Sequence, residues 1–438
     1  MKKNKLSDFN GLSLDNLINQ LYPETPTQAI TEYSEGLPQR FFDSHSQEQQ
    51  AYFCHLLSKI DSSNLFSIIP HFNSRKNGSL SILTYDYPYS LSLFVGIIAS
   101  LDFDIQSASL FSYITKDSVS KGSHAYRKLK NVYGKIVKQM TRKKIIYTFE
   151  GTIPKNLSLE IWQQTLRSRL KEIIQLLEES SKETTLLVVR QRVNQWVSAK
   201  ISKLRKKSAI TIHPTLISTL DHDDCTEFLI ETVDTPFFLY ALTLSLNYIR
   251  LDIVSINIKT ESTTIKDKIY IVDSKGKKLT DQTDIDRVKL IIILLKQFTY
   301  FSANSPNPFQ SITRFIDLIT TVLSKSNQSL WITMLSENGN MKKLARILGA
   351  SDFIWEDFIR IQTESLLPIL NPRTTFEIEK LTAESFHIEL NILLKNASTF
   401  EEKMIQVNKF KNDWTTYIDL HHILKQLNFR QFSKCLSN

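Results

Sequence analysis

The spacing of hydrophobic residues divides the chain into a helical beginning, a mixed middle and a helical end. At the beginning, apolar residues recur every three or four positions in Ser13–Leu21 and in Gln47–Ile60, as they do in amphipathic helices. Prolines break the region between these two stretches. We therefore predict a helical N-terminal segment over residues 1–75.

One stretch in the middle of the chain occurs twice. Thr84–Ile105 (TYDYPYSLSLFVGIIASLDFDI) aligns without a gap with Thr232–Ile253 (TVDTPFFLYALTLSLNYIRLDI), which lies 148 positions later. Both copies have an Asp-x-Pro turn before an apolar helix pattern, and proline is tolerated in a first helical turn. A fixed offset with the same turn and the same apolar spacing indicates a duplicated structural unit. Aligned identical residues include Asp86 and Asp234, Pro88 and Pro236, Leu91 and Leu239, and Asp104 and Asp252.

Each copy is expected to extend into a unit of strand, helix, strand, strand and helix, because a sheet must cover the apolar face of the helix. A closing strand after the second helix would give the split βαβ arrangement of ferredoxin-like domains. We place the first unit at residues 76–182 with a basic insertion at 116–142, a connecting helix and loop at 183–222, and the second unit at 223–300. The expected strands are Ser79–Thr84, Ile105–Tyr113, Lys144–Phe149, Glu227–Thr232, Val254–Ile258 and Lys268–Val272, and the second helices are Leu157–Glu179 and Asp284–Phe298.

Residues 301–438 show little strand pattern and are predicted to form an all-α region. A proline-bounded linker, Asn304–Phe309, leads into it. The predicted fold class is therefore α+β, with two mixed units between an N-terminal helical segment and a C-terminal all-α bundle. The C-terminal helices are expected at Ile312–Ser324, Asn340–Ile347, Asp352–Leu367, Ala383–Leu394 and Thr399–Lys425.

The composition is that of a globular protein. The chain has 438 residues, of which 42% are hydrophobic and 23% are charged, which favours two to four domains. The longest apolar run, Leu290–Leu295, is too short to span a bilayer, so we expect no membrane partner. Cys54, Cys225 and Cys435 are far apart and odd in number, which favours a reducing compartment over a disulfide framework. We therefore expect a cytoplasmic protein.

The net charge of +9 raises the question of a nucleic-acid partner. The basic residues are spread widely, so we favour a solvated basic surface over a nucleic-acid site. The densest cluster falls at the end of a predicted helix, where cations suit the helix dipole. No aromatic residues interleave it, although single-strand binding would use them for stacking. Nucleic-acid binding is thus the weaker alternative, and it would rest on Lys200, Lys203, Arg205, Lys206 and Lys207.

Several groups of residues partly match the pattern of a metal or catalytic site. The run Asp221–Cys225 (DHDDC) contains potential ligands, but adjacent side chains seldom converge on one ion. Gly276 and Lys277, followed by Asp284 and Asp286, imitate the phosphate turn and paired carboxylates of a nucleotidyltransferase. The serine of that turn is absent, and the carboxylates fall where a helix should begin. We therefore predict no metal site. The same holds for His45, His55 and His71 and for the pair His421–His422, whose spacing is not that of a ligand set.

The strand followed by Asp-x-Pro and an apolar helix, present twice, resembles ACT domains. These are small ferredoxin-like modules that bind amino acids or related metabolites and usually work in pairs. The resemblance implies ACT-type βαββα(β) units with a small amino acid as ligand. Many ACT domains have glycine after the proline, where this chain has aromatic residues. The ligand-binding residues that the resemblance implies are Asp86, Pro88, Tyr89, Asp234, Pro236 and Phe237.

Further stretches resemble nitrogen-control enzymes. Lys268–Asp281 (KIYIVDSKGKKLTD) is similar to the ACT repeats of PII uridylyltransferases. Leu344–Leu370 and Phe410–Leu424 are similar to the helical region ahead of the nucleotidyltransferase core in glutamine-synthetase adenylyltransferases. Together these resemblances cover roughly residues 78–430.

The resemblance implies a regulatory and scaffold role that responds to a glutamine-like amino acid. The helical part would connect to glutamine synthetase, to a PII-type protein or to a separate catalytic chain. We expect no cofactor in this chain, and magnesium and ATP would serve only a nucleotidyltransferase core elsewhere. The alternative is a nucleotidyltransferase that modifies glutamine synthetase or PII with AMP or UMP, using Asp284 and Asp286.

Overall fold

The computed structural model contains two compact units, each built from separate parts of the chain. The first, called the sheet unit, comprises Met1–Trp196, Leu216–Asp234 and Arg250–Leu279. The second, called the helical unit, comprises Val197–Thr215, Thr235–Ile249 and Thr280–Asn438. The structure describes residues 13–87, 89–117, 140–154, 157–179, 183–201, 215–233, 238–261, 264–302, 305–322, 328–335, 338–359, 363–370, 382–395 and 397–437.

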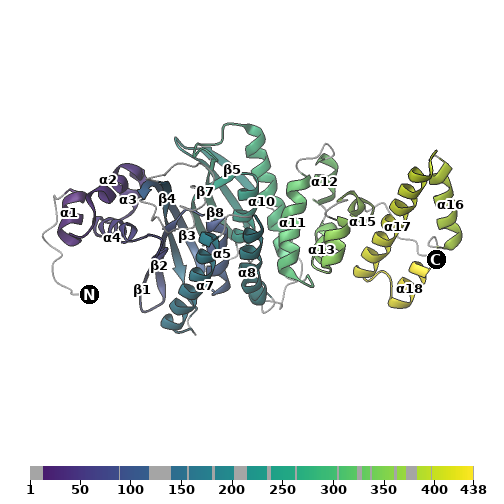
Figure 1. The fold of residues 1–438 in the computed structure, drawn as a ribbon, viewed down its shortest axis with the longest axis horizontal. Helices are drawn as coiled ribbons and strands as arrows, with labels where there is room; N and C mark the ends of the chain where they lie inside the picture. The colour runs from purple at the N-terminus through teal and green to yellow at the C-terminus, as the bar shows by residue number, and fades with distance from the viewer. Residues whose placement is uncertain are drawn as a thin grey trace, which may run out of the picture. The chain divides into compact units, whose positions relative to one another are not determined.

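A single antiparallel sheet of eight strands forms the centre of the sheet unit (Figure 1). The strand order is β1-β2-β4-β3-β7-β8-β6-β5, so the first four strands form one half and the last four form the other. The mixed α+β class is therefore confirmed. The strands are β1 (Phe66–Phe72), β2 (Asn77–Tyr85), β3 (Asp104–Asp117), β4 (Met140–Thr152), β5 (Leu216–Asp221), β6 (Thr226–Val233), β7 (Leu251–Glu261) and β8 (Thr264–Asp273).

The sequence repeat corresponds to a repeat of structure at the same offset. Helices α5 (Ser90–Ser100) and α9 (Phe238–Tyr248) begin and end at equivalent positions. Each is followed by a residue with positive φ, Asp102 at 61° and Arg250 at 60°. The pairing register then shifts at equivalent places in β3 and β7, where a β-bulge adds one residue. The duplication therefore extends to caps and bulges that sequence identity alone does not reveal.

In each half the edge strand comes first in the chain, whereas a closing strand of the predicted unit would come last, after the second helix. Strand β1 pairs with β2 and strand β5 pairs with β6, at the two edges of the sheet. Strand β1 lies within the segment 1–75 that we predicted to be helical. Strand β5 lies within the connecting segment 183–222. Both strands are short, and Pro70 interrupts the pattern of β1, as proline is tolerated on an edge strand.

The hairpin between β3 and β4 is longer than its counterpart between β7 and β8. Ser107 pairs with Glu150, which lies 43 positions away. The equivalent residue, Ser255, pairs with Tyr270, which lies 15 positions away. The insertion predicted at 116–142 falls in this longer hairpin. Its outer residues belong to β3 and β4, which corrects its boundaries, and residues 118–139 lie outside the described part of the chain.

Three N-terminal helices, α2, α3 and α4, pack on the first half of the sheet, and α1 packs on α4 (Figure 1). Tyr33 in α2 and Phe41 in α3 contact Tyr113 and Phe111 of β3, with ring centroids 5.8 and 5.2 Å apart. These aromatic contacts place α3 beside the centre of the sheet. The helices of this unit are α1 (Leu14–Leu21), α2 (Thr27–Gly36), α3 (Gln39–Ser44), α4 (Gln47–Ser58), α5, α7 (Leu159–Glu179) and most of α8 (Glu183–Ile201).

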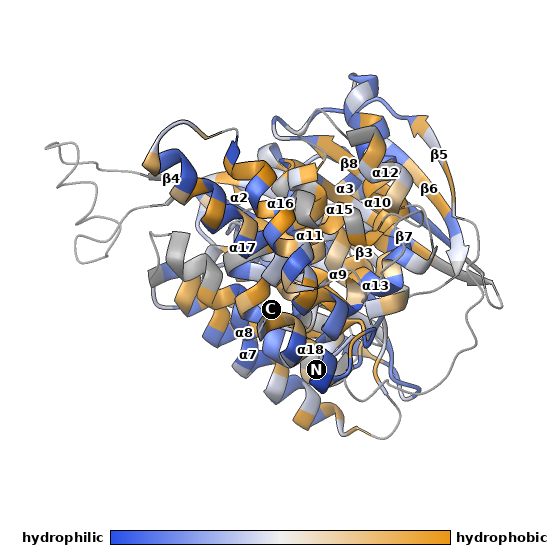
Figure 2. Ribbon diagram, turned by 90° about the vertical axis from the view of Figure 1, so that its right-hand side faces the viewer, coloured by the Kyte–Doolittle hydropathy of each residue, from blue (hydrophilic) through white to orange (hydrophobic). Residues whose placement is uncertain are grey.

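The helical unit packs its helices around buried apolar and aromatic side chains. Phe298 of α10 stacks on Phe315 of α11, with ring centroids 3.7 Å apart. Hydrophobic and hydrophilic residues both appear along α11 and α13 (Figure 2). Besides α9, the long helices are α10 (Gln282–Ser302), α11 (Pro308–Val322), α12 (Gln328–Leu335), α13 (Asn338–Leu348), α16 (Ala383–Lys395), α17 (Phe400–Ile423) and α18 (Phe429–Ser437).

The single helix predicted at Asp352–Leu367 is broken into shorter pieces in the structure. Pro368 explains part of the break, because proline has no N–H and its ring crowds the carbonyl four residues earlier. Pro368 is the second residue of the last piece, which begins at Leu367, and a proline is tolerated in this first turn. The pieces are α14 (Asp352–Ile354), the π-helical turn Trp355–Ile359, the 3₁₀ turn Thr363–Leu366 and α15 (Leu367–Leu370).

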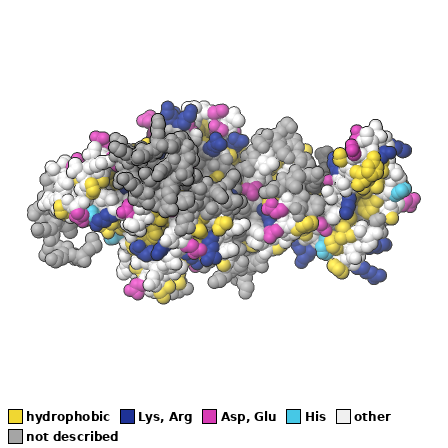
Figure 3. All heavy atoms as spheres, in the orientation of Figure 1, with side chains coloured by type: hydrophobic (Ala, Val, Ile, Leu, Met, Phe, Trp, Pro, Cys, Tyr) yellow, Lys and Arg dark blue, Asp and Glu magenta, His cyan; other side chains and the backbone are white. Residues whose placement is uncertain are grey.

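The C-terminal helices expose hydrophobic side chains. Ile388 and Ile392 on α16 and Ile405 on α17 are 55%, 57% and 64% exposed. Figure 3 shows hydrophobic side chains gathered over these helices. Helices α16 to α18 still share a small core around Ile418 and Cys435. Across the described ranges, no helix is both long and apolar enough to cross a membrane.

Candidate functional site

The two halves of the sheet meet at a short ladder between β3 and β7. In this ladder Ala108 pairs with Ile256, which is its own equivalent in the repeat, so a pseudo-twofold axis passes between them. Because successive side chains of a strand point to opposite faces, their polar neighbours lie together on one face. This polar centre consists of Ser107, Ser109, Ser255 and Asn257.

A pocket of about 430 Å³ lies over the polar centre. Arg40 of α3 lines it on the side of the first half. The loop between β5 and β6, residues 222–225, and Tyr270 of β8 line it on the side of the second half. The volume falls within the range of pockets that hold small molecules. We call this site the axial pocket.

Arg40 and Asp224 form an ion pair in the axial pocket. Nη1 of Arg40 lies 2.9 Å from Oδ2 of Asp224, and the two side chains are 39% and 58% exposed. The guanidinium also lies 5.7 Å from the ring centroid of Phe111, within cation–π range. An ion pair this exposed contributes little to stability, because water screens it. The pair therefore presents one positive and one negative group that a ligand can take over.

A buried carboxylate, Glu227, organises one side of the axial pocket. Its side chain is 6% exposed, and its oxygens lie 3.0 Å from Nε2 of His222 and 2.9 Å from Nζ of Lys268. Burial alone would raise the pKa of Glu227, but hydrogen bonds from Lys268, His222 and Tyr270 bring it below its usual value. The carboxylate is therefore charged at neutral pH and holds His222 and Tyr270 in place.

Two weak acids in the axial pocket are protonated at neutral pH. Burial, together with Glu227, raises the pKa of Tyr270 to about 12. Burial, together with Asp224, raises the pKa of Cys225 to about 11. The thiolate is the reactive form of cysteine, so a thiol with a raised pKa is a poor nucleophile. The pocket therefore offers hydrogen bonds and charges, and Cys225 is not activated for covalent catalysis.

Two of the six ligand residues implied by the resemblance, Asp86 and Tyr89, lie in the described part of the chain. The N–H of Asp86 donates to the carbonyl of Lys143 over 2.9 Å. Tyr89 caps α5 with φ of 63°, a left-handed conformation that glycine adopts readily. Tyr89 thus has a glycine-like backbone at the position where many ACT domains have glycine. Pro88, Asp234, Pro236 and Phe237 lie outside the described residues.

Asp86 interacts with an acidic residue of the second copy, Asp252 at the start of β7. Burial raises the pKa of Asp86 and Asp252 raises it further, while Lys143 lowers it. Burial also raises the pKa of Asp252. Nearby, the hydroxyl of Tyr147 lies 2.5 Å from Oγ of Ser90. The structure therefore brings Asp86 together with the second copy, but neither Asp86 nor Tyr89 lines the axial pocket.

Asp286, one of the remaining candidates, has structural partners. Among the described side chains, no three His, Cys, Asp or Glu residues are placed to hold a metal ion. Asp286 lies in the first turns of α10, where it accepts a hydrogen bond from Gln282 over 2.9 Å and lies 4.0 Å from Lys289. Such contacts between residues three or four positions apart are typical of polar side chains on the surface of a helix. In the basic cluster, residues 203–207 lie outside the described ranges.

The sequence patterns missed most of the axial pocket. One signal was available, because Ser107 and Ser255 are equivalent polar residues of the repeat, as are their neighbours two positions later, Ser109 and Asn257. No local pattern connects Arg40 with Asp224, since helix α3 and the β5–β6 loop meet only in the folded chain. No protein-family model matches this chain, and no curated protein matches it.

Proposed function

We propose that this chain is a regulatory protein whose duplicated sheet binds a small amino acid. The observation that carries the proposal is the axial pocket, where Arg40 and Asp224 present opposite charges beside the polar centre. A free amino acid carries one carboxylate and one ammonium group at neutral pH. It is therefore the class of metabolite that this pair of charges complements.

The ligand would bind by replacing the contact between Arg40 and Asp224. Its carboxylate would accept hydrogen bonds from the guanidinium, whose planar donors match carboxylate geometry. Its ammonium group would donate to the carboxylate of Asp224. The amide of Asn257 and the hydroxyl of Tyr270 would then bind a polar side chain, such as the amide of glutamine.

The order of elements supports an ACT-like origin for each half. Strand β2, helix α5, strands β3 and β4 and helix α7 follow the β-α-β-β-α order of the resemblance. Strand β1 takes the edge position beside β2, which the closing strand occupies in ferredoxin-like domains. We propose that each half is an ACT-like unit whose closing strand comes first in the chain.

We further propose that the helical unit connects the ligand response to a second protein of nitrogen metabolism in the cytoplasm. Glutamine synthetase, a PII-type protein or a separate catalytic chain would be that partner. The resemblance of Leu344–Leu370 to adenylyltransferases supports this role. Arg314 gives the stretch a defined shape, because it donates to the carbonyl of Leu348 over 2.7 Å and pairs with Asp352.

Isothermal titration calorimetry of the full chain against the standard amino acids tests the ligand proposal. We expect saturable binding of one or a few small polar amino acids, with glutamine tested first. The α-amide and the N-acetyl derivative of the bound amino acid serve as matched controls, because each lacks one of the two charges. Both should bind more weakly than the parent. An absence of binding heat for every amino acid would contradict the proposal.

A further inference from the structure

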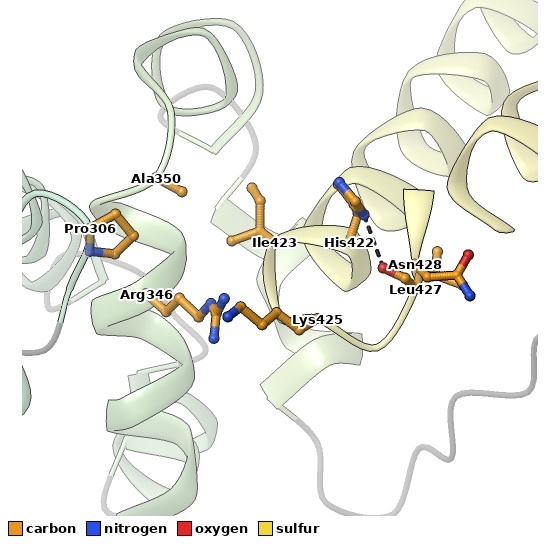
Figure 4. A pocket seen from close by; sticks show the side chains of 8 residues that line it. All are labelled: Pro306, Arg346, Ala350, His422, Ile423, Lys425, Leu427 and Asn428. Atoms are coloured by element: carbon orange, nitrogen blue, oxygen red, sulfur yellow. Dashed lines mark hydrogen bonds between the residues drawn. The ribbon is translucent and has the colours of Figure 1, made fainter. Parts of the chain in front are cut away.

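A second pocket lies within the helical unit, between the end of α13 and the turn that joins α17 to α18 (Figure 4). Its volume is about 580 Å³. Pro306, Ile423 and Leu427 supply apolar walls. Arg346 of α13 and Lys425 of the turn supply two cationic groups. We call this site the cationic pocket.

The side chains of Arg346 and Lys425 point toward each other across the cationic pocket (Figure 4). Like charges repel, although water weakens the repulsion because Lys425 is exposed, and an anion between the two would relieve it. Among the described residues, the eight that line the pocket include no carboxylate. Asp419, which lies one turn before His422 on α17, interacts with that histidine, and burial raises the pKa of Asp419. Two converging cations, with no acid among the described lining residues, are the arrangement of an anion site.

The backbone holds Lys425 in a conformation that side chains rarely adopt. Its φ is 61°, and the N–H of Gln426 donates to the carbonyl of His421 over 3.0 Å. This is a Schellman motif, whose left-handed residue is usually glycine. Asp102 and Arg250 have the same φ after other helices, so the backbone alone does not indicate a ligand. What distinguishes Lys425 is the direction of its charged side chain, into a pocket and toward a second cation.

We propose that the cationic pocket binds a small molecule through a phosphate group. A phosphate monoester carries about 1.5 to 2 negative charges at neutral pH, which matches two cations better than the single charge of a carboxylate. Arg346 would bind two phosphate oxygens with its planar donors, and Lys425 would act as a point charge.

The remaining walls suit the organic part of such a ligand. His422 is fixed by a hydrogen bond from Nδ1 to the carbonyl of Leu427 over 3.0 Å, and its ring stacks on Phe432. Because a carbonyl only accepts, Nδ1 donates this hydrogen bond, and Nε2 is left to hydrogen-bond with a ligand. The volume is large enough for a mononucleotide. This pocket and the axial pocket belong to different units, so the two ligand proposals can fail independently.

Calorimetry with inorganic phosphate, ribose 5-phosphate, adenosine 5′-monophosphate and adenosine tests the proposal on the full chain. We expect the three phosphates to bind and adenosine to bind at least about tenfold more weakly than its monophosphate. Tighter binding of the monoesters than of inorganic phosphate identifies an organic phosphate as the ligand, and equal binding identifies free phosphate. Adenosine that binds as well as its monophosphate overturns the proposal, as does the absence of phosphate binding at millimolar concentration.

Two variants locate the phosphate site, and one variant serves as a control. Arg346→Gln and Lys425→Asn each remove one cation, and asparagine tolerates the left-handed conformation at residue 425. Each should weaken phosphate binding at least about tenfold. Lys342→Gln removes an exposed cation elsewhere on α13 and should change binding by less than about twofold. Unchanged binding in both test variants, or equal losses in all three, overturns the assignment. Circular dichroism checks folding, and Arg346→Met, which also removes the cation, replaces Arg346→Gln if the latter does not fold.

Discussion

Ala108 on β3 pairs with Ile256 on β7, and the two residues are equivalent positions of the sequence repeat. An antiparallel pair of equivalent residues lies on the twofold axis that relates the two copies. One chain therefore contains the kind of isologous contact that a symmetric homodimer forms between two subunits. The residues around the axis are no longer identical, since Ser109 corresponds to Asn257. A ligand on this axis meets both copies but does not need to be symmetric.

Removal of either charge in the axial pocket should weaken amino-acid binding. Arg40→Gln and Asp224→Asn each delete the partner of one ligand charge, so we expect each to cost about tenfold or more in affinity. The stability of the protein should change by less than about 1 kcal/mol, because the pair is exposed. Calorimetry measures the affinity, and thermal unfolding measures the stability. Arg75→Gln, in the exposed β1–β2 turn, is the control and should bind normally. Full affinity in both test variants would rule out this pair as the ligand site.

Glu227 should make the sheet unit sensitive to acid. Its pKa in the folded protein is lower than its usual value, so its stabilisation is present above the unfolded pKa of about 4.3 and is lost as the pH falls through the folded pKa. Glu227→Gln should cost about 1–3 kcal/mol at neutral pH, where hydrogen bonds to a charged group are lost, and should flatten the acid dependence. Urea unfolding at a series of pH values measures both effects. Glu231→Gln on the same strand is the control, and an equal change there would argue against a special role for Glu227.

Gly349 should not tolerate a side chain. A Cβ at this position would lie 1.8 Å from Oγ of Ser305 and 2.9 Å from the carbonyl oxygen of Asn307. Gly349→Ala should therefore destabilise the helical unit by about 1–3 kcal/mol through overpacking. Gly339→Ala is the matched control, because a Cβ there meets nothing within 4 Å and alanine is a better helix former than glycine. Denaturant unfolding followed by tryptophan fluorescence should show shifts of opposite sign, and a loss in both variants would contradict the expected close approach.

Arg250→Gly should stabilise the sheet unit. Residue 250 has φ of 60°, a conformation that costs residues with a Cβ about 1–2 kcal/mol. Glycine removes this strain but loses about 0.5–1 kcal/mol through the entropy of the unfolded chain, so the net gain should be about 1 kcal/mol or less. Arg250→Ala retains the Cβ and should give no gain. A melting temperature that rises equally for alanine and glycine would show that the charge, and not the backbone, is responsible.

The repeated part of the fold could be predicted from the sequence because its signals are local. These signals are the Asp-x-Pro turns, the apolar helix patterns and the alternation in β7 and β8, and each lies within a short window of sequence. The turn and the helix pattern occur in both copies of the repeat, which strengthens the prediction. The edge strands β1 and β5 could not be predicted, because their pairing with β2 and β6 gives them their structure and their own patterns are weak. The broken helix after Ser351 was missed for a related reason, since the apolar spacing continues across the break.

Most residues of the axial pocket could not be predicted from the sequence. Its charged pair joins residues 184 positions apart, Arg40 and Asp224, and no periodicity carries that information. The Asp-x-Pro turns pointed to Asp86 and Tyr89, which lie at the end of β2 and the start of α5 and not in the pocket. His222 and Cys225 belong to the run of potential metal ligands in the sequence, for which we predicted no metal site. In the structure His222 holds Glu227, and Cys225 lines the pocket as a neutral thiol.

Because the ladder between β3 and β7 is short, the two halves of the sheet are connected only weakly. Three residue pairs join the two halves, whereas nine join β2 to β4 and eight join β6 to β8. The halves should therefore separate before either half unfolds, as weakly coupled foldons do. Arg40 lies beside this junction on the side of the first half and Asp224 on the side of the second. An amino acid bound to both residues would therefore link the two halves. The bound ligand would then couple the unfolding of the two halves. We expect two unfolding steps in the protein without ligand and one in the protein with ligand bound.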